Sequence, residues 1–518
     1  MIFEKRKIIA GIEVGSNFLK MKIGQLDRQG DFFLLENLKK TLLIGRDTFN
    51  TGEVSIDTTK QLISHLEGFQ HLLESYGIDT YRCVCTSGLR EAKNRDFIIH
   101  QVAEATGIAI EVINSSTERF LTYKSIRDHI QNHRELREKG CLIMDIGSGS
   151  LELSIYKDHR LQYSQSSNLG SLRIHETLQN LEGESINFSQ ILQEYIEGEF
   201  DDLNYPRGEF PPYFIVLGGD SKTLLEILPS TDEYIEKEVF DKTLRDLLVK
   251  DQLSIPSSSP SGKSLPSTIV PSILLLSMGL RLTQAEGVYL PQVTLTNGLL
   301  VDLVDQLFET PRRVDFSMDL DHLIRKTGEK FMVHASHSEQ VQRLSLSIFD
   351  GLRKEFGLTD HHRFLLKTSA YLHDMGKFVQ DEDHPEHSYY LFRHSQVLGL
   401  SDMDRDKIAQ IMRYHHEGLP NLQKGFFRNF TSKESVELCQ LIGILKIANS
   451  LDQSHLGKLP GLSVKVTEDK ILLKGTYAGN LHLERWSFNR ISHEASRAFG
   501  KKLEFIQKGR FAHEISHN

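Results

Sequence analysis

Two short segments of the sequence contain the residue types that could hold a chain of phosphates. Residues 8–17 and 141–150 each run from an apolar strand through an acid and a Gly-Ser turn into a second apolar stretch. Glycines let the backbone turn tightly and point successive N–H groups into one anion-binding concavity. The acid at the rim, Glu13 or Asp145, can hold a hydrated cation or orient a water. The predicted phosphate contacts are Gly15, Ser16, Asn17, Gly147, Ser148, Gly149 and Ser150.

A cationic phosphate contact is predicted at Arg90. Residues 81–88 indicate a strand that runs into a turn, and residues 89–107 indicate the helix that follows. Arg90 would then lie near the N-terminus of that helix, where anions bind. The alternative is a surface ion pair with the acids around it, which contributes little stability.

A set of histidines and aspartates in the second half of the chain could bind metal. His337, the His373-Asp374 pair, His415 and Asp452 occur in separate helical segments. Imidazole and carboxylate together suit iron, manganese or zinc. Further histidines, His384, His387 and His416 among them, could hold a second ion. Solvated surface histidines are the alternative, since the chain has 23, but the ordered set resembles that of an HD domain.

The pattern along the chain predicts where these residues lie. Short apolar strands alternate with amphipathic helices, for example over 58–76 and 187–203, until about residue 310, which indicates an α/β architecture. Helical periodicity then dominates to about residue 450, followed by a short β segment at 462–473. A chain of 518 residues is too long for one core, and we expect three domains, residues 1–135, 136–312 and 313–518.

Composition excludes several classes of protein. With 39% hydrophobic and 25% charged residues and no apolar run of about 18, we expect no membrane-embedded segment. The first seven residues are not a secretory signal, and four cysteines make no disulfide framework, so we expect a cytoplasmic protein. A net charge of -9 argues against DNA binding, although a localised phosphate site remains compatible with it.

Six motifs between residues 8 and 310 resemble, in their order and spacing, those of the exopolyphosphatase and guanosine pentaphosphate phosphatase (Ppx/GppA) family. They are Gly15-Ser16-Asn17, Thr86 to Asn94, Ile113 to Glu118, Asp145 to Glu152, Asn168-Leu169-Gly170 and Leu217-Gly218-Gly219. The resemblance implies an actin-like (ribonuclease H-like) fold of the ATPase superfamily, with two lobes and a phosphate site that includes Gly218 and Gly219. It also implies a C-terminal helical domain of the HD type and a homodimer.

The resemblance also implies roles for four acids. Glu118 would be the general base on the attacking water, and Asp145 would hold a Mg²⁺ ion or orient that water, with Glu152 nearby and Glu13 as a second ligand of the ion. Hydrolysis of a phosphoanhydride requires these parts, namely an in-line water, a base and positive charge for the transferring group. Taken alone, Glu118 could equally be an exposed acid in the first turn of a helix.

The sequence departs from the family pattern at several phosphate-facing positions. Glu13 replaces an aspartate, Ser148 a glycine and Asp220 a threonine, and Thr296-Asn297 replaces Arg-Glu near the end of the second lobe. Several donors are therefore lost, and Asp220 adds negative charge where a phosphate would lie. These changes put efficient polyphosphate turnover in doubt.

Three functions fit these observations. The first is a phosphoanhydride hydrolase that releases terminal phosphate from polyphosphate or from guanosine pentaphosphate, a nucleotide of the stringent response, in a cleft between the lobes. The second is a metal-dependent phosphohydrolase that acts through the helical domain. The third is a sensor that binds either ligand without turnover. We favour the first, because the base and the acids persist where phosphate donors have changed.

Overall fold

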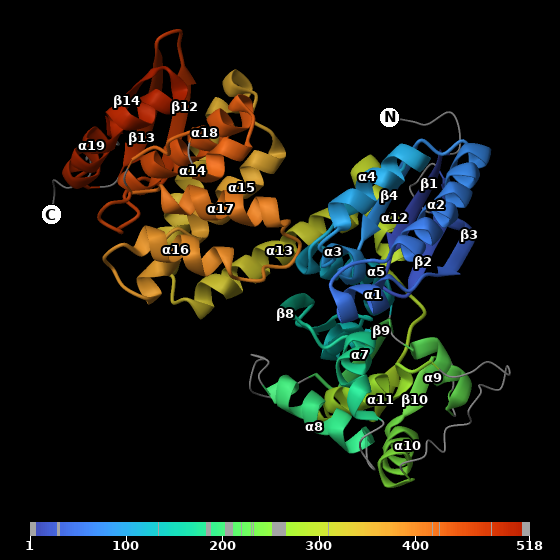
Figure 1. Ribbon diagram of the computed structural model, residues 1–518. Coiled ribbons are helices and arrows are strands. Elements are labelled where there is room, and N and C mark those ends of the chain that lie inside the picture. The colour runs from blue at the N-terminus through green and yellow to red at the C-terminus, as the bar shows by residue number, and fades with distance from the viewer. Residues whose placement is uncertain are drawn as a thin grey trace. The chain divides into compact units, whose positions relative to one another are not determined.

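The computed structural model describes residues 7–27, 32–132, 134–182, 188–201, 211–218, 220–228, 230, 233–250, 266–308, 310–416, 418–423, 425–477 and 479–509. Residue contacts divide the chain into two compact units, Met1–Leu323 and Ile324–Asn518 (Figure 1). Each unit has its own buried apolar clusters, and each is described separately.

The N-terminal unit begins with a five-stranded sheet in the order β3-β2-β1-β4-β5. Strands β1 and β2 form an antiparallel hairpin, β3 pairs antiparallel with β2, and β4 and β5 continue the sheet in parallel. The elements are β1 (Lys7–Val14), β2 (Phe18–Leu26), β3 (Phe32–Thr41), α1 (Ile44–Thr51), α2 (Ile56–Tyr76), β4 (Thr80–Cys85), α3 (Ser87–Arg90), α4 (Arg95–Thr106), β5 (Ile110–Val112), α5 (Ser115–Asn132) and α6 (Arg134–Lys139).

A second sheet in the same unit repeats this plan, with the order β10-β11-β9-β6-β7-β8. An antiparallel meander, β6 to β8, is again followed by a parallel strand, β9. The elements are β6 (Cys141–Ile146), β7 (Leu151–Lys157), β8 (Arg160–Ser167), α7 (Ser171–Glu182), α8 (Phe188–Asp201), β9 (Tyr213–Gly218), α9 (Ser221–Ile227), β10 (Tyr234–Glu236), α10 (Lys237–Lys250), α11 (Ile269–Leu282) and β11 (Gly287–Tyr289). The chain then returns to the first lobe, where α12 (Leu295–Leu307) packs on β1, β2 and α5, and continues into α13 (Pro311–Lys330). The predicted two-lobed α/β fold is confirmed.

One predicted helix is divided in two. The sequence indicated a helix over 89–107, but α3 ends at Arg90 and α4 starts at Arg95. Asn94 explains the interruption, because its side chain exchanges two hydrogen bonds with the backbone of Val54, at 3.1 and 2.9 Å. A side chain that bonds a distant backbone in this way competes with continuation of the helix.

The C-terminal unit is mainly helical, as predicted, with a three-stranded sheet in the order β12-β13-β14 (Figure 1). One apolar cluster runs from Ile324 to Phe505 and joins the helices to this sheet. Its elements are α14 (Ala335–Phe356), α15 (Asp360–Leu372), η1 (Met375–Phe378), α16 (His384–Arg393), α17 (Asp402–Arg413), η2 (Gly425–Asn429), α18 (Ser432–Ser450), β12 (Gly461–Val466), β13 (Lys470–Tyr477), α19 (His482–Phe499) and β14 (Lys502–Gly509).

The described residues also give information on membrane-spanning helices and on the cysteines. None of their helices is both long enough and apolar enough to cross a bilayer. All four cysteines are buried and free, at positions 83, 85, 141 and 439.

Two helical glycines provide a matched test of packing. A Cβ added to Gly298 in α12 would collide with the backbone carbonyl of Leu121 in α5, whereas Gly68 in α2 has no heavy atom within 4 Å of its Cβ position. We expect Gly298→Ala to lower the free energy of unfolding by about 1–3 kcal/mol, because the two helices must move apart. Gly68→Ala should raise it by up to about 1 kcal/mol through helix propensity. Urea denaturation of both variants measures the difference, and equal effects would contradict this account.

Candidate active cleft and metal centre

The two predicted phosphate turns have the same hairpin geometry. In the first, the Gly15 N–H donates to Phe18 O at 3.0 Å, and in the second the Gly147 N–H donates to Ser150 O at 2.8 Å. Each turn joins the first two strands of its sheet, β1 to β2 and β6 to β7. The two turns therefore occupy equivalent places in the two lobes.

These turns lie close together because glycines around them carry no side chain. Ser16 Oγ lies 3.2 Å from Ser87 Oγ, and a Cβ on Gly88 would come within 2.8 Å of the same Ser16 Oγ. A Cβ on Gly149 would collide with Ser87 Oγ, and one on Gly170 would collide with the backbone of Gly149. A larger residue at Gly149 would push the two lobes apart, whereas one at Gly88 or Gly170 would displace the turn of its own lobe.

Glu118 lies in the first turn of α5 and is bound by Arg90. The Asn114 side chain accepts from the Thr117 N–H at 2.8 Å, which satisfies one free donor at the helix start. Arg90 Nη1 donates to Glu118 Oε2 at 2.8 Å and to Ile113 O at 2.9 Å. Arg90 lies at the C-terminal end of the short helix α3, so the expected position near a helix N-terminus is wrong. Its predicted phosphate contact stays a prediction.

Asp145 and Glu152 face each other across the hairpin of β6 and β7, where they are paired in register. Gly218, with φ of 66°, leaves room for the Asp145 carboxylate, since a Cβ there would lie 2.6 Å from Oδ1. Both acids line a cavity of about 20 Å³, which also includes Thr122 and Arg119. A cavity of this size holds about one water molecule.

The three predicted catalytic acids share one buried environment. Burial first, and then the negative charge of Glu118, raises the pKa of Asp145 to about 7. The same two causes raise the pKa of Glu152 well above its ordinary value. Burial also raises the pKa of Glu118, against the opposing effect of Arg90. Among the described residues, no hydrogen-bond donor reaches the buried Glu152 Oε1. Carboxyls held in this state can exchange a proton near neutral pH.

The other predicted cleft residues differ in their hydrogen-bond partners. Glu13, a predicted Mg²⁺ ligand, is bound by Lys20 Nζ at 3.0 and 3.2 Å. The Asn17 Oδ1 atom is buried and has no hydrogen-bond partner among the described residues. Gly219, a predicted phosphate contact, lies outside the described residues. Next to it, Asp220 accepts from Ser272 Oγ at 2.8 Å.

The predicted metal ligands of the C-terminal unit come together around Asp374. Among the described residues, two groups of three ligand atoms lie within 4.8 Å of one another, and both contain this carboxylate. One group adds His337 and His373, and the other adds His384 and His415. The four imidazole Nε2 atoms lie 3.8, 3.5, 3.3 and 3.6 Å from an Asp374 oxygen, in the order His337, His373, His384 and His415.

The opposite ring nitrogens show which histidine atoms are free to bind metal. The Nδ1 atoms of His373, His384 and His415 lie 2.9, 2.8 and 2.6 Å from the backbone carbonyls of the residues three positions earlier. A carbonyl only accepts, so each Nδ1 carries the proton and each Nε2 presents a lone pair. His384 Nε2 and His415 Nε2 are only 3.3 Å apart. Lone pairs this close repel each other unless a cation lies between them.

Asp452 contacts His337 and lies outside the ligand groups around Asp374. Its Oδ2 lies 2.8 Å from His337 Nδ1, and its Oδ1 accepts from the Gly457 N–H at 2.8 Å. Asp452 belongs to neither group of close ligand atoms. It orients His337 in the way that carboxylates orient metal-binding histidines. Burial lowers the pKa of His373 to about 3, which keeps this imidazole neutral.

Three residues of these sites were missed or left unassigned by the sequence. Arg119 is buried beside Glu152 and acts electrostatically on it. The sequence motif ends at the preceding residue, Glu118, so it gave no role to Arg119. Lys20 follows the first turn by three residues, at a position that the motif leaves open. His384 was named only as one of several further histidines, and its place beside Asp374 depends on the turn that precedes α16.

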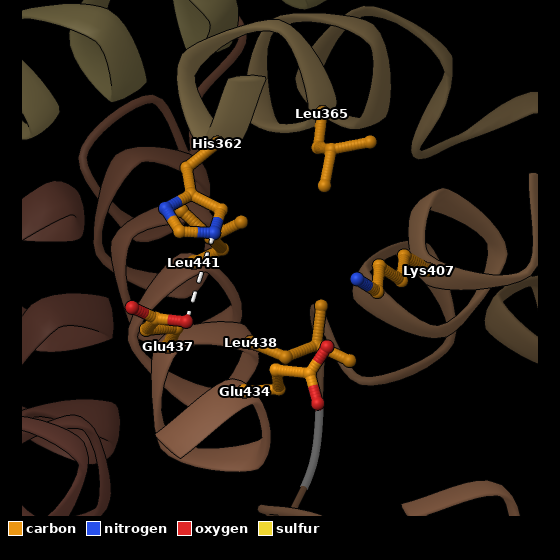
Figure 2. A pocket seen from close by; sticks show the side chains of 7 residues that line it. All are labelled: His362, Leu365, Lys407, Glu434, Glu437, Leu438 and Leu441. Atoms are coloured by element: carbon orange, nitrogen blue, oxygen red, sulfur yellow. Dashed lines mark ion pairs between the residues drawn. The ribbon is translucent and has the colours of Figure 1, made fainter. Parts of the chain in front are cut away.

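A larger hollow in the C-terminal unit contains none of the predicted site residues. Figure 2 shows this pocket of about 160 Å³, in which His362 and Glu437 form an ion pair of 3.8 Å. Its other lining residues are Leu365, Lys407, Glu434, Leu438 and Leu441. The predicted chemistry therefore does not involve this pocket.

The raised pKa of Asp145 predicts a pH-dependent change in stability. The folded protein holds this proton up to about pH 7, whereas the unfolded chain releases it near 3.8, so the stability that it contributes is lost as the pH rises through 7. We expect Asp145→Asn to increase the free energy of unfolding by about 1–4 kcal/mol at pH 8 and to change it little at pH 4. Denaturation at both pH values measures this, and an equal effect at both would contradict it.

Comparisons with known proteins identify the family of this chain. The sequence model of the Ppx/GppA phosphatase family matches residues 24–306, and that of Ppx/GppA phosphatase, domain III, matches residues 321–485. The guanosine-5'-triphosphate,3'-diphosphate pyrophosphatase of Vibrio campbellii is 23% identical over 480 residues, 90% of this chain and 91% of that protein. The same-named protein of Photobacterium profundum is 21% identical over 479 residues, with the same coverage of 90% and 91%.

Solved structures are also similar. The Ppx/GppA family member of Aquifex aeolicus has a TM-score of 0.49 and 19% identity, and covers 59% of this chain and 100% of its own. An exopolyphosphatase from Cytophaga hutchinsonii has a TM-score of 0.48 and 19% identity, with 58% and 98% covered. Because the family's sequence model matches residues 24–306, more than half of the 518 residues, this chain belongs to the Ppx/GppA phosphatase family.

Proposed function

We propose that the N-terminal unit hydrolyses phosphoanhydride bonds and releases orthophosphate from the end of inorganic polyphosphate or from guanosine pentaphosphate. The observation that carries this proposal is the group of three acids at the cleft, in which Glu152 is buried and Glu118 and Asp145 are half-buried. Asp145 and Glu152 line a cavity of about 20 Å³. The names of the relatives in Vibrio campbellii and Cytophaga hutchinsonii support both substrates.

In this proposal Glu118 takes the proton of the attacking water. Burial raises its pKa, which makes the carboxylate a stronger base toward the water than an exposed glutamate. Arg90, which binds Glu118 at 2.8 Å, would move its guanidinium to the phosphate when substrate enters. The turns at Gly15 and Gly147 would donate N–H groups to the transferring phosphoryl group.

A divalent ion fits this cleft on the side of Asp145. The Asp145 carboxylate lines the cavity, and Glu152 Oε1 is buried without a donor among the described residues. Glu13 would have to exchange Lys20 for the ion. A bound Mg²⁺ would supply positive charge for the phosphate oxygens. Asp145 and Glu13 would hold it, and Asp145 would also orient the water.

Glu118→Gln tests this assignment. We expect phosphate release from long-chain polyphosphate and from guanosine pentaphosphate to fall by about 10²–10⁴-fold, because the amide cannot accept the proton. The matched control is Glu104→Gln on the exposed face of α4, which should keep full activity. Malachite green assays with Mg²⁺ measure both. A wild-type protein that releases no phosphate from either substrate, or an active Glu118→Gln variant, would contradict the proposal.

A second function is favoured by the convergence of four Nε2 atoms on Asp374. We propose that the C-terminal unit binds divalent transition metal as an HD-type centre, with His337, His373, Asp374 and His415 as ligands and Asp452 behind His337. His384 adds a ligand on the second side of Asp374, which gives room for two ions that share this carboxylate. Lys377 Nζ, at 2.6 Å from Asp374 Oδ2, now supplies the positive charge there. Bound metal would support hydrolysis of a phosphate ester.

Metal binding can be measured without an activity assay. We expect chelator-treated protein that carries Asp145→Asn, which removes the proposed ion site of the cleft, to bind up to two equivalents of Mn²⁺ in titration calorimetry and to gain several degrees in Tm, because the ion binds only the folded state. Asp374→Ala should lose both equivalents and His384→Ala one, whereas His493→Ala, an exposed residue of α19, should lose none. Equal binding by wild type and Asp374→Ala would contradict this centre.

We also propose a location, an oligomeric state and an excluded ligand. Four buried free cysteines are compatible with a reducing, cytoplasmic location. A homodimer and the absence of DNA binding are expected from the family resemblance and from the net charge of -9. A sensor that binds polyphosphate or guanosine pentaphosphate without turnover is the outcome if binding is measured and release is absent.

A further inference from the structure

Three charged side chains form a row across the first sheet. The strand register pairs Glu13 of β1 with Lys20 of β2, and Lys20 with Lys39 of β3. Residues paired directly across strands point to the same face with their Cβ atoms about 5 Å apart. Lys20 donates to Glu13 at 3.0 Å, and Lys39 lies over the Phe18 ring at 3.5 Å. The row therefore carries two ammonium groups and one carboxylate.

More positive charge surrounds this row. Lys22, two residues after Lys20 on the same face of β2, donates to the neutral acceptor Asn297 Oδ1 at 2.7 Å. From the second lobe, Lys222 and Asp220 both act electrostatically on Lys39. Like charges directly opposite on neighbouring strands are destabilising unless an anion relieves them.

The row begins at the hydrolytic centre and leads away from it. Lys20 and Glu13 both act on the Asp145 carboxyl, whereas Lys39 lies one strand further out, on the outermost strand of the sheet. Lysines are point charges that bind phosphates without requiring one orientation. A ligand that pairs with every lysine of such a row needs a negative charge opposite each of them. A linear polyphosphate has this property.

We propose that Lys20, Lys39 and Lys222 form a cationic track that binds internal phosphates of an inorganic polyphosphate chain whose end lies at Glu118 and Asp145. This inference rests on the proposed function and makes it more specific, since it assigns long chains rather than short phosphates as the preferred ligand. The track also supplies charge where the family's phosphate donors are missing, and Lys222 offsets the acid that Asp220 introduces.

Lys39→Ala and Lys40→Ala are a matched pair for the test. Both side chains are exposed on β3, but Lys40 is paired with Leu19 and so points to the opposite face of the sheet. We measure equilibrium binding of long-chain polyphosphate and of tripolyphosphate by titration calorimetry, with chelator and at two salt concentrations. Lys39→Ala should weaken binding of the long chain about tenfold or more and reduce its salt dependence. Tripolyphosphate should be affected less than threefold.

The remaining variants separate the track from the proposed reaction. Lys222→Ala should reproduce the effect of Lys39→Ala from the other lobe, Lys39→Arg should restore binding, and Lys40→Ala should bind as wild type. In turnover, Lys39→Ala should raise KM for the long chain and leave kcat unchanged. Equal binding by the Lys39→Ala and Lys40→Ala variants, or equal losses for both ligands, would overturn the track. Lys39-dependent binding without phosphate release would contradict the hydrolysis and retain the track.

Discussion

The candidate cleft depends on one steric constraint, the close packing around Ser87, which contacts both phosphate turns. Gly149 of the second lobe lies against the Ser87 side chain of the first, so a side chain at this glycine would separate the lobes. Gly88 lies against Ser16 and Gly170 against the backbone of Gly149, so a side chain at either would displace the turn of its own lobe. The same absence of side-chain atoms allows the Asp145 carboxylate to lie beside Gly218.

This close packing also determines the electrostatics of the cleft. Because the lobes meet closely, Glu118, Glu152 and Asp145 lie in low-dielectric surroundings, and their pKa values rise together. Two arginines, Arg90 and Arg119, prevent the accumulation of uncompensated negative charge. The lysines of β2 and β3 lie at the edge of this group. Negative charge is therefore concentrated where a water would react, and positive charge where a polyanion would approach.

Sequence patterns predicted those features that depend on local chemistry. The Gly-Ser turns at Gly15 and Gly147, the strand that delivers Asp145 and the histidines around Asp374 all belong to short motifs with a local physical reason. Features that depend on distant contacts were not predictable. The helix break at Asn94 requires Val54, forty residues away, and Asp452 was predicted as a ligand but lies behind His337. The Lys20–Lys39 pairing became visible only with the strand register.

The histidine centre of the C-terminal unit has its proton positions set almost entirely by the main chain. His373, His384 and His415 each bond the carbonyl three residues earlier, at Ala370, Asp381 and Met412. A main-chain carbonyl is present whatever side chain follows it. The residues at these three positions are therefore free to vary during evolution without changing which nitrogen is available. Only His337, which relies on the Asp452 side chain, needs a partner that must be inherited with it.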